Sequence, residues 1–234
     1  MIKKSLRNNV VRFTLTIILS LAYSVLRETE YSTLVKPLPI IFWLIVILNS
    51  DRIRSSRWVI ASLSLALIGD ILLDLGDQWL QVGSIPFLIS TALLGWAFHR
   101  RLIHSTSKTT LKKKFVVLTL TGISFIVLYL FLISYSTEAA LIGGVLFSIS
   151  ALLITASLNN FLFNSREKEV YLIPLLGLVG ACGIVLNYVF YSIDLYVMSI
   201  PRDVVIQVYY WGTALATWSF LDRTDQDMAS LASN

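Results

Sequence analysis

Three aspartates recur at steps of four and three residues in and just after an apolar stretch: Asp70, Asp74 and Asp77. Side chains at these steps share one face of an α-helix. Ionisable groups inside a membrane helix are costly, so they usually face a bundle interior or a cavity and serve a function. Asp70, the deepest in the apolar run, is therefore the first candidate for a functional carboxyl group. Asp74 and Asp77 have a simpler alternative, the helix end and the turn before Trp79, which we favour for Asp77.

Few other side chains in the sequence suit catalysis or metal binding. Cys182 is the only cysteine, which excludes a disulfide within the chain and a four-cysteine metal site. His99 and His104 lie beside arginines without a cluster of acidic residues or cysteines, so we expect no metal site and no cofactor. A glycine-rich phosphate loop and a Gly-x-Ser-x-Gly nucleophile motif are both absent. The aspartates therefore remain the centre of any chemistry.

The composition places these carboxyl groups in a membrane. Of 234 residues, 56% are hydrophobic and only 14% are charged, whereas soluble domains carry about 25% charged residues. A water-soluble fold of this length could not hide so much apolar surface. The formal charge of +5 comes from basic residues in short loops between apolar runs. Because such residues set membrane topology, we expect no nucleic-acid partner.

Apolar runs of membrane-spanning length predict an all-α membrane protein, a bundle of about eight transmembrane helices. The expected spans are residues 9–26, 36–50, 57–75, 79–98, 115–135, 139–160, 170–191 and 203–221. With a cytoplasmic N-terminus, only Arg27, Lys36 and Arg202 of the 19 lysines and arginines fall on the opposite side. The positive-inside rule therefore predicts that both termini are cytoplasmic. We expect one multi-pass domain, residues 1–221, in the inner (cell) membrane, and a flexible polar tail, residues 222–234.

Uncharged polar side chains and glycines inside the spans are most simply explained as contacts between helices. Such side chains hydrogen-bond across helix interfaces in lipid, and small residues let helices approach closely. The polar set comprises Ser90, Thr91, Ser148, Ser150, Thr155, Asn187, Tyr188, Gln207, Tyr209, Tyr210 and Thr213. The glycines are Gly143, Gly144, Gly177, Gly180 and Gly183. Neither set indicates catalysis by itself.

Four short motifs follow one another along nearly the whole chain. They are Lys36-Pro37-Leu38, Ser64 through Gly69-Asp70-x-x-Leu73, Gly143-Gly144-Val145-Leu146-Phe147-Ser148-Ile149-Ser150-Ala151, and Tyr209-Tyr210-Trp211-Gly212-Thr213. In this order the chain resembles the YhhN, or lysoplasmalogenase, family of small eight-helix membrane proteins. Each motif alone is weak, because apolar helices resemble one another easily; the shared order carries the resemblance.

The chain also departs from that family's pattern at polar positions. The family's second aspartate falls on Ala151, its histidine in the fourth helix on Thr91, a following tyrosine on Leu94 and its glutamine on Thr213. Of the family's polar residues, only Asp70 is clearly kept in this chain. Fold does not by itself imply activity, so an inactive or re-purposed relative stays open.

The resemblance implies hydrolysis of the vinyl-ether bond of lysoplasmalogens to a fatty aldehyde and a glycerophospho-alcohol. The difficult step protonates the alkenyl carbon and produces an oxocarbenium-like cation. A buried carboxyl group that keeps its proton suits this step, and a nearby carboxylate can steady the cation. We therefore expect Asp70 to be the acid and Asp74 to replace the missing carboxylate. The substrate-binding residues expected with them are Ser64, Ser150, Tyr209, Tyr210 and Thr213.

Two alternatives to the hydrolase remain. The first is a catalytically inactive relative that binds lipid or organises the membrane, because Ala151, Thr91 and Thr213 lack the family's polar groups. The second, weaker one is a small transporter, although the sequence shows no clear pair of broken helices and no internal repeat. For the hydrolase and for the inactive relative, the expected partner is a lysophospholipid or another single-chain lipid, within the bilayer.

Overall fold

The computed structural model describes residues 2–50, 53–75, 80–103, 149–159, 161–162, 172–196 and 199–221, with a few isolated residues between 119 and 130. Within these ranges the chain is almost entirely helical and contains no strand. The helices are α1 (Ile2–Leu26), α2 (Ser32–Val35), α3 (Leu38–Leu48), α4 (Ile53–Asp74), α5 (Leu80–Ile103), α8 (Leu172–Tyr196) and α9 (Arg202–Leu221). A further helical stretch covers Ile149–Asn159. The expected all-helical fold class is confirmed for the described residues.

Three of these helices contain segments long and apolar enough to cross a membrane, again counting only the described residues. The segments are Arg7–Leu26, Val82–Arg100 and Leu172–Tyr191. The predicted span 115–135 and the first part of the span 139–160 lie almost wholly outside the described residues, as does the tail 222–234. The total of about eight spans and the cytoplasmic position of both termini therefore stay predictions.

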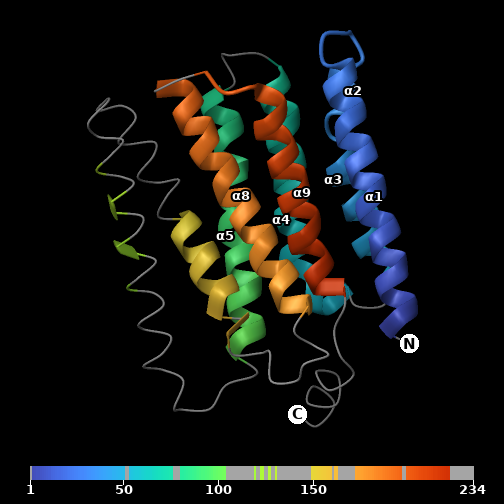
Figure 1. Ribbon diagram of the computed structural model, residues 1–234, viewed down its shortest axis with the longest axis vertical. Coiled ribbons are helices and arrows are strands. Elements are labelled where there is room, and N and C mark those ends of the chain that lie inside the picture. Colours follow the sequence, from blue (N-terminus) through green and yellow to red (C-terminus); the bar gives the residue numbers. More distant parts are fainter. Residues whose placement is uncertain are drawn as a thin grey trace.

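Several pairs of neighbouring helices run antiparallel, as their contacts show, whereas α5 and α9 run parallel, with Phe87 against Tyr209 and Phe98 against Phe220. Along α4 and α5, Ser62 contacts Ser90 and Gly69 contacts Phe87. The same reversal relates α8 to α9 and α1 to α9, and Figure 1 shows these helices side by side as one bundle. The start of α1 and the end of α9 lie at the same end of the bundle (Figure 1). Consequently, residues far apart in the sequence meet at equal depth.

Glycines set the close approach of α8 to α9. A Cβ atom at Gly180 would lie 2.6 Å from the carbonyl oxygen of Gly212, and one at Gly212 would lie 2.8 Å from the backbone nitrogen of Ile184. Gly177 and Gly183 also face α9 across the same interface. The predicted role of these glycines as helix contacts is confirmed, whereas Gly143 and Gly144 lie outside the described residues.

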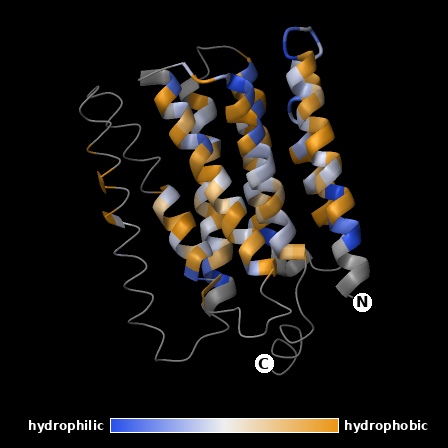
Figure 2. Cartoon of the chain, in the orientation of Figure 1, coloured by the Kyte–Doolittle hydropathy of each residue, from blue (hydrophilic) through white to orange (hydrophobic). Residues whose placement is uncertain are grey.

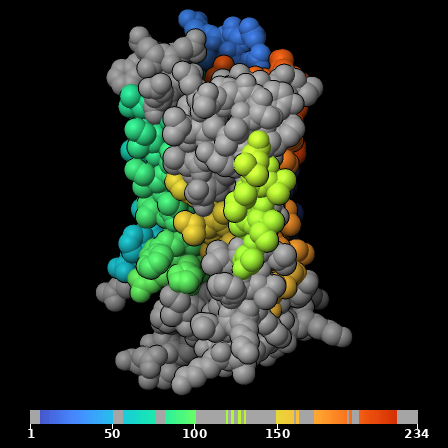
Figure 3. Space-filling model, turned by 90° about the vertical axis from the view of Figure 1, so that its left-hand side faces the viewer, coloured from blue at the N-terminus to red at the C-terminus, as the bar shows by residue number. Residues whose placement is uncertain are grey.

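The 149–159 helix packs on α5 through another glycine. A Cβ atom at Gly95 would lie 3.3 Å from the Cα atom of Leu153, which is fully buried. Figure 3 shows this helix (yellow) beside α5 (green) on one face of the molecule. The helix therefore covers the side of α5 that carries Gly95.

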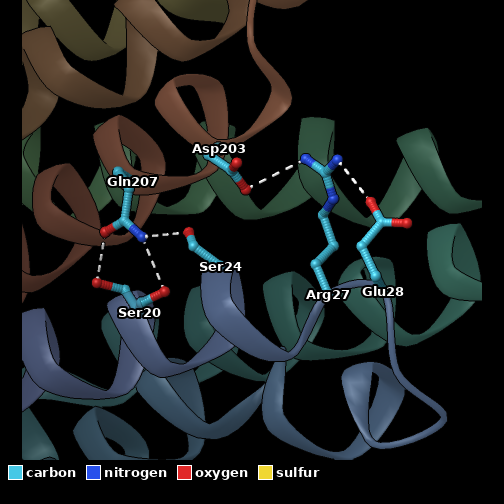
Figure 4. Close-up of polar contacts among 6 residues, drawn as sticks. All are labelled: Ser20, Ser24, Arg27, Glu28, Asp203 and Gln207. Carbon is cyan, nitrogen blue, oxygen red and sulfur yellow. Dashed lines mark hydrogen bonds and ion pairs between the residues drawn. The ribbon is translucent and has the colours of Figure 1, made fainter.

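Polar side chains fasten α1 to α9 inside the bundle (Figure 4). The Gln207 side-chain nitrogen donates to the Ser20 carbonyl oxygen at 2.8 Å and to the Ser24 hydroxyl at 3.0 Å, and the Ser20 hydroxyl donates to Gln207 Oε1 at 2.6 Å. Near the helix ends, Arg27 pairs with Asp203 at 3.2 Å and with Glu28 at 3.0 Å. The hydrogen bond from Arg27 to Glu28, with the charge of Asp203, raises the pKa of the guanidinium group. The prediction that Gln207 joins helices is confirmed.

The opposite face of α1 is apolar and exposed. Its exposed side chains are Val10, Val11, Leu15, Ile18, Leu21 and Val25. Figure 2 shows hydrophobic residues along most of this helix and hydrophilic residues toward its N-terminal end and in the loop that follows it. An apolar exterior over a partly polar interior is the arrangement expected of a helix in lipid.

The predicted second span, residues 36–50, is interrupted at its beginning. The short helix α2 ends at Val35, and α3 starts afresh at Leu38 with Pro37 as its N-cap and Pro39 in its first turn. Proline suits the start of a helix, because its missing N–H would have no partner there. Lys36 and Pro37 thus form a short turn between α2 and α3 and keep helical backbone angles.

Candidate functional site

Asp70 is buried inside the bundle, as the sequence predicted, with only 5% of its surface exposed. Its helix, α4, is held against α5 at the preceding residue, because a Cβ atom at Gly69 would lie 2.6 Å from the ring of Phe87. This close contact fixes the depth and rotation of α4, so that Asp70 points toward α9 and the turn before α3. The carboxyl group therefore lies among protein atoms rather than among lipid chains.

Tyr210 from α9 is the direct neighbour of the Asp70 carboxyl group. Its hydroxyl group lies 3.1 Å from Asp70 Oδ2 and donates a 2.6 Å hydrogen bond to the backbone carbonyl oxygen of Lys36. The Tyr210 ring lies 5.3 Å from the ring of Tyr209, which in turn packs edge-on against Phe87. These ring contacts hold the phenol in place between α4 and the turn at Lys36.

Lys36, at the beginning of the predicted second span, lies inside this cluster. Only 4% of its surface is exposed. Its ammonium group lies 3.1 Å from Asp74 Oδ1 and 3.4 Å from the backbone oxygen of Asp70. Buried charges in membrane proteins pair with one another, and this pairing explains why a lysine occupies an apolar position. The turn between α2 and α3 places the side chain there.

Asp74 is the acidic partner of this lysine. One turn beyond Asp70 on α4, its side chain is 15% exposed and forms a salt bridge with Lys36. Its second oxygen, Oδ2, is buried without a hydrogen-bond partner in the described part of the chain. The Lys36 charge is matched by Asp74, so Asp70 has a phenol and no separate cation at hydrogen-bond distance among the described residues.

A small cavity lies beside this cluster, between α4, α5, α8 and α9. Its volume is about 10 Å³. Ala66, one turn before Asp70 on α4, is part of its wall, and Tyr209 and Thr213 line it from α9. Thr91 and Leu94, two positions where the chain departs from the YhhN pattern, line it from α5. The cavity and the Asp70 cluster therefore share the α4–α9 interface.

The other predicted substrate-binding serines lie elsewhere. Ser64 is half-buried and does not line the cavity, whereas Ser62, two residues earlier, does. Ser150 is fully buried on the 149–159 helix, and its hydroxyl group has no partner among the described residues. Ala151 follows it in a half-buried position. Asp77, which we assigned to the turn after α4, lies outside the described residues.

Two residues of this region were missed as site candidates. Lys36 could have been found from a general rule, because a buried aspartate pair calls for a cation and Lys36 is a basic residue at the mouth of a predicted span. Tyr188 hydrogen-bonds Thr91 and lines the cavity, but nothing in its sequence context distinguishes it from other tyrosines. The described residues contain no group of three or more His, Cys, Asp or Glu side chains that could hold a metal ion.

Comparison with known proteins gives one match. The profile of the YhhN family matches residues 31–220, which include α2 through α9 and all residues of the Asp70 cluster. No curated protein and no solved structure matches the chain.

Proposed function

The chain belongs to the YhhN family, and from this membership and the buried Asp70 cluster we propose that it is a membrane hydrolase of lysoplasmalogens. The observation that carries the proposal is the position of Asp70. It is a carboxyl group buried beside a phenol, while the only cation near it, among the described residues, is bound to Asp74. A carboxyl group in such surroundings is suited to give and take a proton.

The count of hydrogen atoms around Tyr210 supports a protonated Asp70. A phenol carries one hydrogen, and two oxygen atoms lie within reach of it, the Lys36 carbonyl oxygen at 2.6 Å and Asp70 Oδ2 at 3.1 Å. If the phenol gives its hydrogen to the nearer oxygen, the contact with Asp70 needs a hydrogen from the carboxyl group itself. A protonated Asp70 thus satisfies both contacts and holds the proton that the reaction requires.

The proposed reaction consumes one water molecule. Asp70 transfers its proton to the double-bond carbon that is not bonded to the ether oxygen, which leaves an oxocarbenium ion at the neighbouring carbon. Water adds to that carbon and returns a proton to the Asp70 carboxylate, and the resulting hemiacetal breaks into a fatty aldehyde and the glycerophospho-alcohol. Asp74 stays the candidate for steadying the cation, because its Oδ2 atom is free of hydrogen bonds to the described residues.

The test is aldehyde release by the purified protein in detergent with lysoplasmalogen as substrate. We expect the wild-type chain to release aldehyde and Asp70→Asn to lose the activity by roughly 10²-fold or more, the usual size of a general-acid effect. Asp203→Asn, which alters a half-exposed carboxylate of the Arg27 pair, is the matched control and should keep the activity. A wild-type protein that releases no aldehyde would exclude the hydrolase.

A non-catalytic lipid-binding protein is the second candidate, because Ala151, Thr91 and Thr213 lack the family's polar groups. A volume of about 10 Å³ is far below the roughly 300–1,000 Å³ of typical ligand pockets, so a lipid chain would need a bundle that opens. For this candidate, a lysophospholipid with a saturated chain should raise the unfolding temperature in detergent without turnover. No thermal shift with any lysophospholipid would count against it.

A further inference from the structure

The cavity between α4, α5, α8 and α9 has a lining without charge. Its polar groups are all hydroxyls, and the remaining lining side chains are aliphatic apart from the tyrosine rings. A volume of about 10 Å³ is close to the smallest space in which a protein holds one water molecule. An ion in this space would meet no opposite charge, so the lining suits a small neutral guest.

Four of the hydroxyl groups that line the cavity form two hydrogen-bonded pairs, and each pair joins two helices. Ser62 of α4 and Ser90 of α5 share a hydrogen bond of 3.0 Å, and Thr91 of α5 bonds to the hydroxyl group of Tyr188 of α8. A hydroxyl oxygen has two lone pairs, so Ser62 and Ser90 can each accept a further hydrogen bond. These pairs form part of the cavity wall without filling the space.

Two hydroxyl groups on α9 are different. Tyr209 and Thr213 are 7% and 6% exposed. Neither hydroxyl oxygen has a hydrogen bond of ordinary length and angle within the described ranges of the chain, although the two groups lie close enough to each other to interact. Both residues line the cavity. They are four residues apart on one helix, so their side chains lie on the same face. Buried hydroxyl groups without a partner are costly, and one small guest between them would satisfy both.

We propose that this cavity is a binding site for a single water molecule, with the hydroxyl groups of Tyr209 and Thr213 as its ligands. The water accepts or donates one hydrogen bond with each of them, and the paired hydroxyls of the opposite wall offer further acceptors. The site does not depend on the hydrolase activity, because it is made by side chains that the bundle buries with or without a substrate.

The test uses brief X-ray radiolysis of the wild-type protein in detergent with H₂¹⁸O, followed by mass spectrometry. Radicals formed from a bound water hydroxylate the side chain beside it even where bulk solvent is excluded. We expect Tyr209 to gain several-fold more ¹⁸O-labelled product than its neighbour in sequence, Tyr210. Tyr210 is also buried, 1% exposed against 7%, and it bonds to protein groups away from the cavity. Equal labelling of the two tyrosines would overturn the proposal, and would also be the result if the two hydroxyl groups bonded directly to each other.

A pair of variants sharpens the test. Thr213→Val keeps the volume of the side chain and removes one water ligand, so labelling of Tyr209 should fall toward the level of Tyr210. The control is Thr16→Val, which removes a buried hydroxyl group that binds Trp43 on the other side of the bundle. It should leave the labelling of Tyr209 unchanged. If Thr213→Val also leaves it unchanged, Thr213 is not a ligand and the proposed site is wrong. Loss of aldehyde release in Asp70→Asn has no bearing on this outcome.

Discussion

At the scale of single residues, the Lys36–Asp74 ion pair is the most consequential contact. Both partners lie in an apolar bundle, where an isolated charge is far more costly than a paired one. Of the two, Lys36 is the more deeply buried, with 5% of its side chain exposed against 15% for Asp74. Removing one partner therefore leaves a buried charge, whereas removing both does not.

We expect Lys36→Met to lower the free energy of unfolding by about 3–5 kcal/mol, because Asp74 then stays behind without its cation. The double variant Lys36→Met, Asp74→Leu should recover much of this loss. Thermal unfolding in detergent measures both. As a control, Arg27→Met disrupts an exposed pair, whose contribution is about 0–1 kcal/mol. A Lys36→Met protein as stable as the Arg27→Met protein would contradict the burial of this pair.

At the scale of helices, two kinds of contact hold the bundle together. The α8–α9 interface depends on glycines, since the two backbones lie too close for a side chain at Gly180 or Gly212. The α1–α9 interface depends instead on polar side chains around Gln207. In lipid, close packing and interhelical hydrogen bonds replace the hydrophobic effect as the source of helix association.

Gly180→Ala should destabilise the protein by about 1–3 kcal/mol or more, the usual cost of overpacking. The added methyl group would overlap the backbone of Gly212 and Ala216, and neither can move aside without shifting α9. Gly122→Ala is the matched control, because a Cβ atom at Gly122 meets no atom within 4 Å. Thermal unfolding of the two variants under one condition decides the question; equal unfolding temperatures would argue against the close approach.

Gln207→Leu should weaken the attachment of α1 by about 1–2 kcal/mol, since it removes the hydrogen bonds to Ser20 and Ser24. The control is Thr14→Val on α1, whose exposed hydroxyl group bonds to the Val10 carbonyl oxygen one turn away. Unfolding measured in detergent should distinguish the two variants. Were Thr14→Val the more harmful, the polar attachment of α1 to α9 would be wrong.

At the scale of the whole molecule, the distribution of basic residues makes a prediction about orientation. If both termini are cytoplasmic, the loop between α1 and α2 faces the opposite side of the membrane. Its residue Thr29 is exposed and so is accessible to a probe. The chain has one native cysteine, Cys182, which Cys182→Ser removes before new cysteines are introduced.

In that background, Thr29→Cys should react with a membrane-impermeant maleimide on intact cells. Ser5→Cys and Ser233→Cys, near the two termini, should react only after the cells are opened. Mass spectrometry or a gel shift measures the labelling, and the opened sample is the control for reactivity. Labelling of either terminal cysteine on intact cells would reverse or break the predicted topology.

Local properties of the chain were enough to predict part of this protein. The cost of burying a carboxyl group in an apolar run predicted that Asp70 faces the interior of the bundle. The length and composition of the apolar runs predicted an all-helical membrane fold. The order of the motifs indicated the YhhN family. Each of these properties is carried by a few neighbouring residues, so no knowledge of the packing was needed.

The partners of those residues were decided only by the tertiary structure. Lys36 meets Asp74 because the turn before α3 packs against α4, and Tyr210 meets Asp70 because α9 packs antiparallel to α4. Likewise, the rotation of α4 puts Ser62 rather than Ser64 on the cavity. Such contacts join positions far apart in the chain, and the physical reason that the sequence alone did not reveal them is that they depend on which helix faces meet and at what depth.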